Sequence, residues 1–270
     1  MTLALSRRPH ELRLAIFLLT VASLHPLLVW TGRRALDGSD EPLGLVALFV
    51  AGVVVHRRRR PPPASVQLAP AAVLLVGYAA AVMFLTPLPG GLLGAAAVAC
   101  IVSQLYLGRR LDLGLLALLW LSLPLIASLQ FYLGFPLRIL ATEVAAVLLR
   151  AGGLPLVVEG AALRLGPDVI GVDAPCSGVK MLWAGGLVIS ARVAALELSG
   201  RWAVLAFASA VIALVLANGI RAAALFYSEA ELLPLPDWGH SAVGIVVFGM
   251  TAALLLQVSR YLAERQRCVA

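Results

Sequence analysis

Residues 202–220 read WAVLAFASAVIALVLANGI, nineteen consecutive positions without a charged side chain, and Arg201 and Arg221 flank them. An uncharged run of this length matches the hydrocarbon core of a bilayer and predicts a transmembrane helix. The whole chain has the same character, because 61% of its 270 residues are hydrophobic, 13% are charged and the mean hydropathy is +0.96. Soluble domains carry about a quarter charged residues. The composition therefore excludes a soluble enzyme with a single anchor and predicts a polytopic membrane protein.

Apolar runs between charged or Pro/Gly breaks predict eight spans. They cover about residues 13–30, 43–56, 66–87, 90–107, 113–135, 177–197, 202–220 and 240–259. The second run is short, but without it the four arginines 57–60 would lie on the outer side of the membrane or every later span would invert. We therefore expect an all-α fold, a polytopic membrane bundle of about eight transmembrane helices.

The distribution of charge predicts how these spans are oriented. With both termini cytoplasmic, the inner segments hold 14 cations and 4 acids, a net charge of +10. The outer segments hold 6 cations and 10 acids, a net charge of −4, and Lys180 within a span completes the total of +7. Cytoplasmic loops carry an excess of Lys and Arg. The basic charge thus reports orientation and gives no support to a nucleic-acid partner.

One long connection, from Pro136 to Pro175, falls on the outer side. Apolar residues at helical spacing over Leu137–Leu149 predict an amphipathic helix on the membrane surface. Alternation in Leu156–Gly160 and Leu163–Leu165 predicts a short hairpin before the sixth span. No soluble domain remains, so residues 1–270 are expected to form a single integral membrane domain, in which residues 1–89 lack distinctive motifs and residues 90–260 carry the candidate site.

The three cysteines do not form a disulfide framework, because Cys100 lies mid-span and Cys268 in the cytoplasmic tail. Cys176 differs in its position within Asp173-Ala-Pro-Cys-Ser-Gly178, where an outward-facing helix is expected to begin. Unpaired N–H groups and the positive end of a helix dipole favour the thiolate, which is the nucleophilic form. Ser177 is an alternative N-cap for the same helix, and Asp173 equally suits an N-terminal charge.

Two further motifs lie at outer helix ends. Asn218-Gly-Ile-Arg221 ends the seventh span, and Asp237-Trp-Gly-His240 begins the eighth. Charge counting places Cys176, Arg221 and His240 on one side of the membrane, so they can converge in one shallow site. A thiolate attacks a peptide carbonyl, a histidine moves protons between the thiol and the leaving amine, and a guanidinium stabilises the oxyanion.

At these residues the chain resembles the exosortase/archaeosortase family of polytopic membrane cysteine transpeptidases. The resemblance rests on Cys176-Ser177-Gly178 opening a span, Asn218-x-x-Arg221 ending the next and His240 beginning the last. Upstream, Leu129–Gly134, the amphipathic stretch and the Glu159-Gly160 turn are also similar, and the resemblance covers about residues 90–260. Pro175 departs from the small residue expected before the cysteine, but proline is compatible with a helix start.

The resemblance implies a membrane cysteine protease or transpeptidase without cofactor or metal. Its substrates would be exported proteins with a C-terminal motif, a transmembrane helix and a basic tail. The acyl group would pass from the enzyme to an amine acceptor. It implies Cys176 as nucleophile, His240 as general acid/base and Arg221 as oxyanion or substrate stabiliser. The site would face the extracytoplasmic side of the cytoplasmic membrane.

Two other classes of function stay open. Asp173-x-x-Cys176 and Asp237-x-x-His240 each place an acid three residues before a metal-ligand type, so a zinc-dependent membrane protease is the nearest chemical alternative. The other is a transporter or a non-enzymatic assembly component of an envelope pathway, for which polar residues at mid-membrane are expected. The polar residues of this chain concentrate at one rim instead, which favours a surface site.

Overall fold

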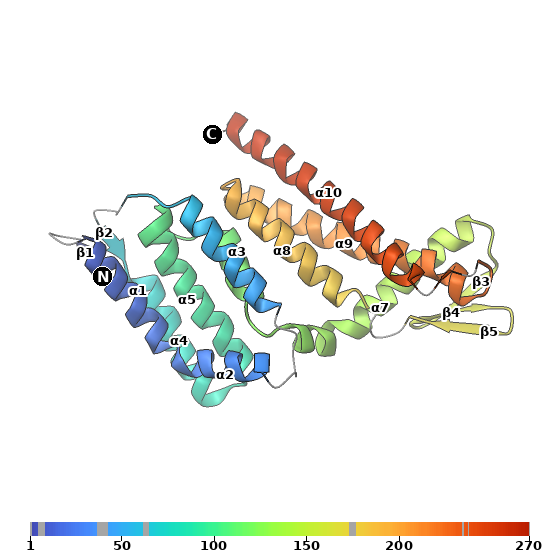
Figure 1. The fold of residues 1–270 in the computed structure, drawn as a ribbon, viewed down its shortest axis with the longest axis horizontal. Coiled ribbons are helices and arrows are strands. Elements are labelled where there is room, and N and C mark those ends of the chain that lie inside the picture. Colours follow the sequence, from blue (N-terminus) through green and yellow to red (C-terminus); the bar gives the residue numbers. More distant parts are fainter. Residues whose placement is uncertain are drawn as a thin grey trace. The chain divides into compact units, whose positions relative to one another are not determined.

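The computed structural model describes residues 2–4, 9–36, 43–61, 65–172, 177–233, 235–236 and 238–269, which are mostly helical (Figure 1). In chain order the elements are β1 (Thr2–Ala4), α1 (Pro9–Ser23), α2 (His25–Leu36), α3 (Gly44–Arg57), β2 (Ser65–Gln67), α4 (Ala69–Phe84), α5 (Pro87–Leu107), α6 (Leu113–Leu121), α7 (Ile126–Ala151), β3 (Leu156–Glu159), β4 (Ala162–Leu165), β5 (Asp168–Gly171), α8 (Val179–Ala195), α9 (Gly200–Glu229) and α10 (Gly239–Val269). Two compact units result. The first contains residues 1–125, 190–204 and 262–270, and the second contains residues 126–189 and 205–261.

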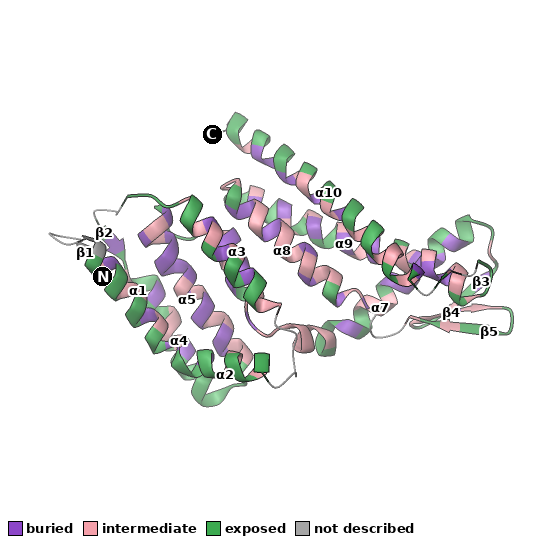
Figure 2. Cartoon of the chain, viewed as in Figure 1, coloured by how far each residue is buried: buried purple, intermediate pink, exposed green. Residues whose placement is uncertain are grey.

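The first unit is organised around α5, which contacts α1, α2, α3, α4 and α6. Two thirds of its most apolar window, 67%, is buried, consistent with a central position (Figure 2). Small residues allow this close packing: a Cβ added at Gly94 would lie 3.0 Å from a methyl group of Leu24. Larger side chains along α5 would force its neighbours apart.

Prolines shorten several of the expected spans. The run 13–30 forms two helices, α1 and α2, which are bent by 64° at their junction. Pro26 lacks an N–H, and its ring clashes with the carbonyl four residues earlier, so α1 cannot continue through it. The run 113–135 is interrupted in the same way: α6 ends at Leu121, and α7 begins at Ile126 after Pro124.

The amphipathic helix expected over Leu137–Leu149 is not a separate element. It is the second half of α7, which runs unbroken from Ile126 to Ala151 with Pro136 inside it. The sequence prediction ended a span at this proline. The helix instead accommodates the loss of one backbone donor, as apolar helices packed against neighbours can do.

Among the residues that the structure describes, four helices are long and apolar enough to cross a membrane, namely α5, α7, α9 and α10, and the bent pair α1–α2 makes up to five. Helices α3 and α4 are apolar but shorter. In α10 only 11% of the apolar window is buried, and exposed side chains such as Ile245 and Met250 continue along it (Figure 2). Apolar exposure of this kind is typical of a lipid-facing surface. The chain is thus a multi-pass membrane protein, while the count of eight spans stays a prediction.

One ion-pair cluster joins segments that charge counting assigns to the same membrane side. The Glu197 carboxylate lies 2.9 Å from Arg109 and 3.0 Å from Arg60, and Arg58 lies 2.7 Å from Asp112. Gln266 of the C-terminal helix donates to the Glu197 carbonyl at 3.2 Å. The connections after α3, α5 and α8 and the end of α10 therefore meet at one end of the first unit, as a common membrane side requires.

Acid should weaken this cluster. Burial raises the pKa of Glu197, but Arg58, Arg109 and Arg60 outweigh it, and the net pKa lies below the ordinary value of 4.5. A carboxyl whose folded-state pKa is depressed contributes stability above its unfolded-state pKa and loses it as pH falls through the folded-state pKa. We expect Glu197→Gln to lower the unfolding temperature at pH 7 and to approach the parent protein at acidic pH, as pH falls through the depressed folded-state pKa of Glu197.

Thermal unfolding in detergent as a function of pH measures this effect. Glu264→Gln is the matched control, because this substitution removes the same charge and Glu264 is exposed on α10. A constant difference between the Glu197→Gln variant and the parent across this pH range would contradict the ionic role of Glu197.

The second unit contains an antiparallel sheet in the order β3-β4-β5, so the expected hairpin is present and is extended by a third strand. Val157 pairs with Arg164, and Leu163 pairs with Ile170. Each turn has two residues and begins with a glycine at positive φ, Gly160 at 62° and Gly166 at 60°, as tight hairpins require. Leu156 and Leu163 are buried against α7 and α9, which fixes the sheet beside α9.

Candidate active site

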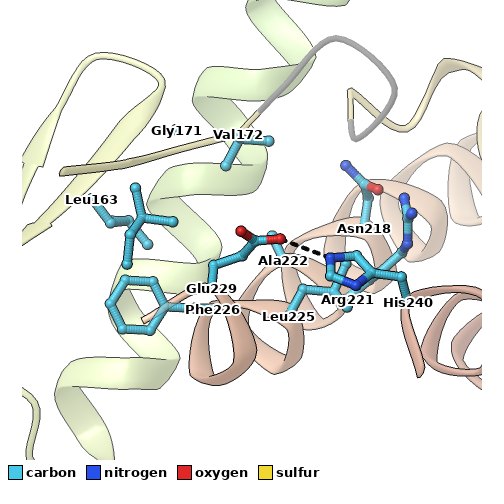
Figure 3. A pocket seen from close by; sticks show the side chains of 11 residues that line it. Leu163, Gly171, Val172, Asn218, Arg221, Ala222, Leu225, Phe226, Glu229 and His240 are labelled. Atoms are coloured by element: carbon cyan, nitrogen blue, oxygen red, sulfur yellow. Dashed lines mark hydrogen bonds and ion pairs between the residues drawn. The ribbon is translucent and has the colours of Figure 1, made fainter. Parts of the chain in front are cut away.

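A cavity of about 80 Å³ lies within the second unit, between the sheet, α9 and the start of α10. Leu163 and Val172 line it from the sheet and the segment that follows, and Phe226 lines it from α9. The polar lining comes from α9 and α10: Asn218, Arg221, Glu229 and His240. In Figure 3 the side chains of Asn218, Arg221 and His240 are drawn on the side of the cavity away from Leu163 and Phe226. The cavity therefore has one apolar and one polar side.

The polar residues of α9 share one helical face. Asn218, Arg221, Leu225 and Glu229 follow one another at intervals of three or four residues, which is the spacing of one face. The sequence prediction ended this helix at residue 220, but α9 continues to Glu229 and includes Arg221. At about 1.5 Å per residue, a helix of 30 residues is about 45 Å long and exceeds the hydrocarbon thickness of about 30 Å. Its last two turns can therefore project beyond the hydrocarbon.

Arg221 lies where α9 meets α10. A Cβ added at Gly244 of α10 would be 3.4 Å from the Arg221 Nε, so only a small residue allows this approach without crowding the guanidinium. The Nε atom is buried and has no hydrogen-bond partner among the residues that the structure describes. A buried donor without a partner is costly unless a ligand or water satisfies it. An oxygen acceptor that entered the cavity would satisfy this donor.

His240 lies in the first turn of α10, as the sequence predicts. Its hydrogen-bond partner is Glu229, which the sequence analysis did not include among the candidate site residues. The His240 Nε2 lies 2.8 Å from the Oε1 of Glu229 (Figure 3). Both side chains are about half exposed, at 45% and 51%. A carboxylate at Nε2 favours the tautomer with the proton on that nitrogen, which leaves Nδ1 as the proton acceptor. Glu229 thus orients an imidazole that can accept a proton.

Ser177 and Gly178 are packed against α7 and α9. The buried Ser177 hydroxyl donates to the Gln130 Oε1 of α7 at 2.9 Å. Gly178 has φ 84°, and a Cβ added there would lie 2.7 Å from the Asn218 side chain. The Gly178 carbonyl accepts the first helical hydrogen bond, from Leu182 N at 2.8 Å, so Gly178 and not Ser177 is the N-cap of α8. This start of α8 is thereby held beside Asn218, which lines the cavity.

Three of the predicted site residues, Asp173, Cys176 and Asp237, lie outside the described residues. Of the other four, Asn218, Arg221 and His240 line the same cavity, and Ser177 is one residue from Gly178, which contacts Asn218. The histidines and cysteines elsewhere in the described helices, among them His25, His56, Cys100 and Cys268, do not line this cavity. The structure thus brings together those predicted residues that it describes.

An exposed ion pair joins the two strands β3 and β4 of the hairpin beside the cavity. Arg164 donates two hydrogen bonds to the Glu159 carboxylate, at 2.7 and 2.8 Å. The hydrogen bond from Arg164, together with its charge, lowers the pKa of Glu159. Since both groups are exposed, the pair contributes to the geometry of the hairpin more than to its stability.

No group of three or more His, Cys, Asp or Glu side chains that could hold a metal ion occurs among the described residues. Glu229 and His240 form a pair only. Asp173, Cys176 and Asp237, on which the zinc alternative depends, lie outside the described ranges.

Gly178 offers a structural test of the close contact with Asn218. We expect Gly178→Ala to lower the unfolding temperature substantially, because alanine at φ 84° is strained and its Cβ would overlap the Asn218 amide. Gly160→Ala is the matched control, since Gly160 also has positive φ but has no atom within 4 Å of an added Cβ. It should show only the conformational cost, about 1–2 kcal/mol. Equal shifts for both variants in thermal unfolding would contradict the contact.

The fold and the cavity define a class of protein: a multi-pass membrane protein in which an arginine and a carboxylate-paired histidine line one cavity. Comparison with protein-family models identifies the class more closely. The model described as transmembrane exosortase matches residues 30–257 of this chain, and the chain belongs to the transmembrane exosortase family. The match extends further toward the N-terminus than the motifs from which the resemblance was inferred. No curated protein and no solved structure was found to match.

Proposed function

We propose that this protein is a membrane transpeptidase that cleaves exported proteins near a C-terminal sorting signal and transfers them to an amine acceptor. The observation that carries this proposal is the shared cavity of Asn218, Arg221 and His240, with His240 paired to Glu229 at 2.8 Å. Membership of the transmembrane exosortase family supports it. The proposed location is the cytoplasmic membrane, with the cavity on the extracytoplasmic face.

The proposed nucleophile is Cys176. One peptide bond joins it to Ser177, and consecutive Cα atoms lie about 3.8 Å apart. Ser177 is anchored to Gln130 and Gly178 is packed on Asn218, which lines the cavity, so the two residues that follow Cys176 in the chain are tethered beside that cavity. This tether supports the assignment of Cys176 over Cys100 and Cys268, which lie on α5 and at the end of α10.

In the proposed reaction, the Cys176 thiolate attacks the scissile carbonyl carbon, and a C–S bond forms. Arg221 donates hydrogen bonds to the oxygen on which negative charge develops, the role that its unpartnered Nε suits. The C–N bond then breaks, and His240 gives a proton to the leaving amine. The acyl group remains on the enzyme as a thioester. His240 next takes a proton from the acceptor amine as that amine attacks the thioester carbonyl carbon. The C–S bond breaks and Cys176 is released as the thiolate.

The proposed substrates are exported proteins with a short recognition motif, a transmembrane helix and a basic tail. Such a helix would orient with its basic tail at the cytoplasmic side, by the same rule that orients the enzyme. Its outer end would then lie at the level of the last turns of α9, where Arg221 and Glu229 stand. The position of the cavity near these turns supports cleavage just outside the hydrocarbon.

Trapping the acyl-enzyme tests the proposal. A tagged candidate substrate is co-expressed with the parent enzyme and with a His240→Gln variant. We expect the thioester on Cys176 in the parent enzyme and less of it in the variant, because slower protonation of the leaving amine slows thioester formation. Mass spectrometry of the Cys176 peptide gives the adduct mass. Absence of an adduct across several substrates that the parent enzyme processes would overturn the thiol mechanism.

Inhibition separates the thiol mechanism from the zinc alternative. In a Cys268→Ala background, where the Cys100 thiol is buried, we expect alkylation of Cys176 to stop processing, while EDTA and phenanthroline leave it unchanged. If the chelators stopped processing, and processing continued after alkylation of Cys176, a metal-dependent mechanism would be favoured instead.

A further inference from the structure

A second cavity, of about 450 Å³, lies in the first unit between α1, α3, α5 and α6. It shares no lining residue with the cavity at Arg221. Its wall is apolar along most of its length, with Phe17 from α1, Leu48 from α3, Val98 from α5 and Leu115 from α6. In a chain that spans a membrane, such a cavity between helices suits a hydrocarbon chain.

The polarity of the cavity changes along α3. Leu48, Gly52 and Val55 line its apolar part, and His56 and Arg59 line its basic end. From Leu48 to His56 the helix rises about 12 Å, which is the approximate length of the apolar part. Tyr106 from α5 lies at the same end as Arg59, because the Arg60 N–H donates to the Tyr106 carbonyl at 2.8 Å. The cavity is therefore an apolar groove that ends in a basic cluster.

The charge of Arg59 is not balanced by a neighbouring acid. Arg58 and Arg60, its neighbours in sequence, pair with Asp112 and Glu197. Arg59 instead lies over the Tyr106 ring, with 5.1 Å between its Cζ and the ring centroid, and has no carboxylate partner among the described residues. The Arg13 guanidinium lies over the same ring at 4.5 Å. Two like charges beside one ring repel each other, and an anion between or beside them relieves that repulsion.

We propose that this cavity binds an anionic phospholipid of the bilayer, with an acyl chain along the apolar groove and the phosphate at His56 and Arg59. Basic pockets between transmembrane helices are suited to anionic headgroups. The apolar length favours a lipid over a free phosphate ion, which would leave the groove unfilled. The site goes beyond the proposed transpeptidase function and does not depend on it.

Native mass spectrometry tests the headgroup contact. The full chain is reconstituted in nanodiscs of equal phosphatidylglycerol and phosphatidylcholine, released, and analysed for bound lipid. We expect the parent protein to retain phosphatidylglycerol preferentially and Arg59→Gln to lower that retention about fivefold, which is the factor that one basic residue typically contributes. Arg57→Gln is the matched control. It removes the same charge from the same run of arginines, and Arg57 does not line the cavity.

Gly52→Leu tests the hydrocarbon contact. No atom lies within 4 Å of a Cβ added at Gly52, so leucine there fits the backbone and fills part of the groove. We expect it to lower lipid retention even with Arg59 intact. Gly249→Leu is the control, since Gly249 on α10 is equally unobstructed and does not line the cavity.

Three outcomes would overturn the proposal. Equal retention by the parent, Arg59→Gln and Gly52→Leu proteins would show that the cavity holds no lipid. An equal fall in Arg57→Gln would show general surface attraction. Displacement of the lipid by inorganic phosphate, added at increasing concentration, would show a free-anion site without the hydrocarbon contact. Thermal unfolding of each variant in the same detergent confirms that the proteins compared are folded.

Discussion

Replacement of Cys176 by alanine is expected to lower substrate processing by about 10³-fold or more, to the background of cells without the enzyme. The magnitude follows from the role proposed for the thiol: without a nucleophile no thioester forms, and removal of the covalent nucleophile is among the most damaging single changes in enzymes of this kind. The ratio of processed to unprocessed tagged substrate on immunoblots, in cells lacking other copies, measures the effect.

Two matched controls test whether the loss is specific to Cys176. Cys100→Ala and Cys268→Ala each remove one thiol, and neither residue lines the cavity at Arg221. Cys100 is buried in a cluster with Ile101 and Leu105, so its variant is expected to lose some stability and to keep processing. Normal processing by Cys176→Ala with normal membrane insertion would remove the basis of the proposed mechanism.

Cys176→Ser separates chemistry from shape. Serine nearly preserves the size of the side chain, but its hydroxyl does not ionise near neutral pH and is a weak nucleophile without further activation. We expect its processing to resemble that of the alanine variant. A serine variant with substantial activity would mean that residue 176 contributes through packing or hydrogen bonding instead of as a thiolate.

The membrane character of the chain could be predicted from the sequence because hydrophobic length is a direct consequence of bilayer thickness. The division into helices was less predictable. Pro26 and Pro124 interrupt apolar runs, whereas Pro136 lies inside a continuous helix. Whether a proline ends a helix depends on the packing of the turn that it disrupts, which the local sequence does not contain.

The sequence predicts some of the residues that line the cavity, but not the contacts between helices. Arg221 and His240 were selected by their residue types and their positions near helix ends, and both line the cavity. Glu229 was counted only as an outer charge, because the seventh span was ended before Arg221. Glu229 follows Arg221 by eight residues, a spacing that places both side chains on one face of a helix. A prediction that extended the seventh helix to residue 229 would have included Glu229 on that face. The contact of 2.8 Å between Glu229 and His240 joins two helices, and such a contact between helices could not be predicted from the sequence.

The pairing of Glu229 with His240 leads to the second large effect. We expect His240→Gln to lower processing by about 10²–10⁴-fold, the usual contribution of a general acid or base. Glu229→Gln keeps the shape of the side chain but removes the charge that orients the imidazole, and we expect a loss of about 10- to 100-fold. Glu229 would act through His240 and is a positioning residue.

A double-mutant cycle distinguishes this role from a general effect on stability. If Glu229 acts through His240, adding Glu229→Gln to the His240→Gln variant should cause little further loss of processing, since the imidazole to be oriented is absent. Glu229→Asp should recover part of the activity in the parent background. Glu231→Gln is the control for charge, because Glu231 is exposed nearby and does not line the cavity. Additive losses for the two substitutions, or an equal loss in Glu231→Gln, would show that Glu229 influences processing by a route other than His240.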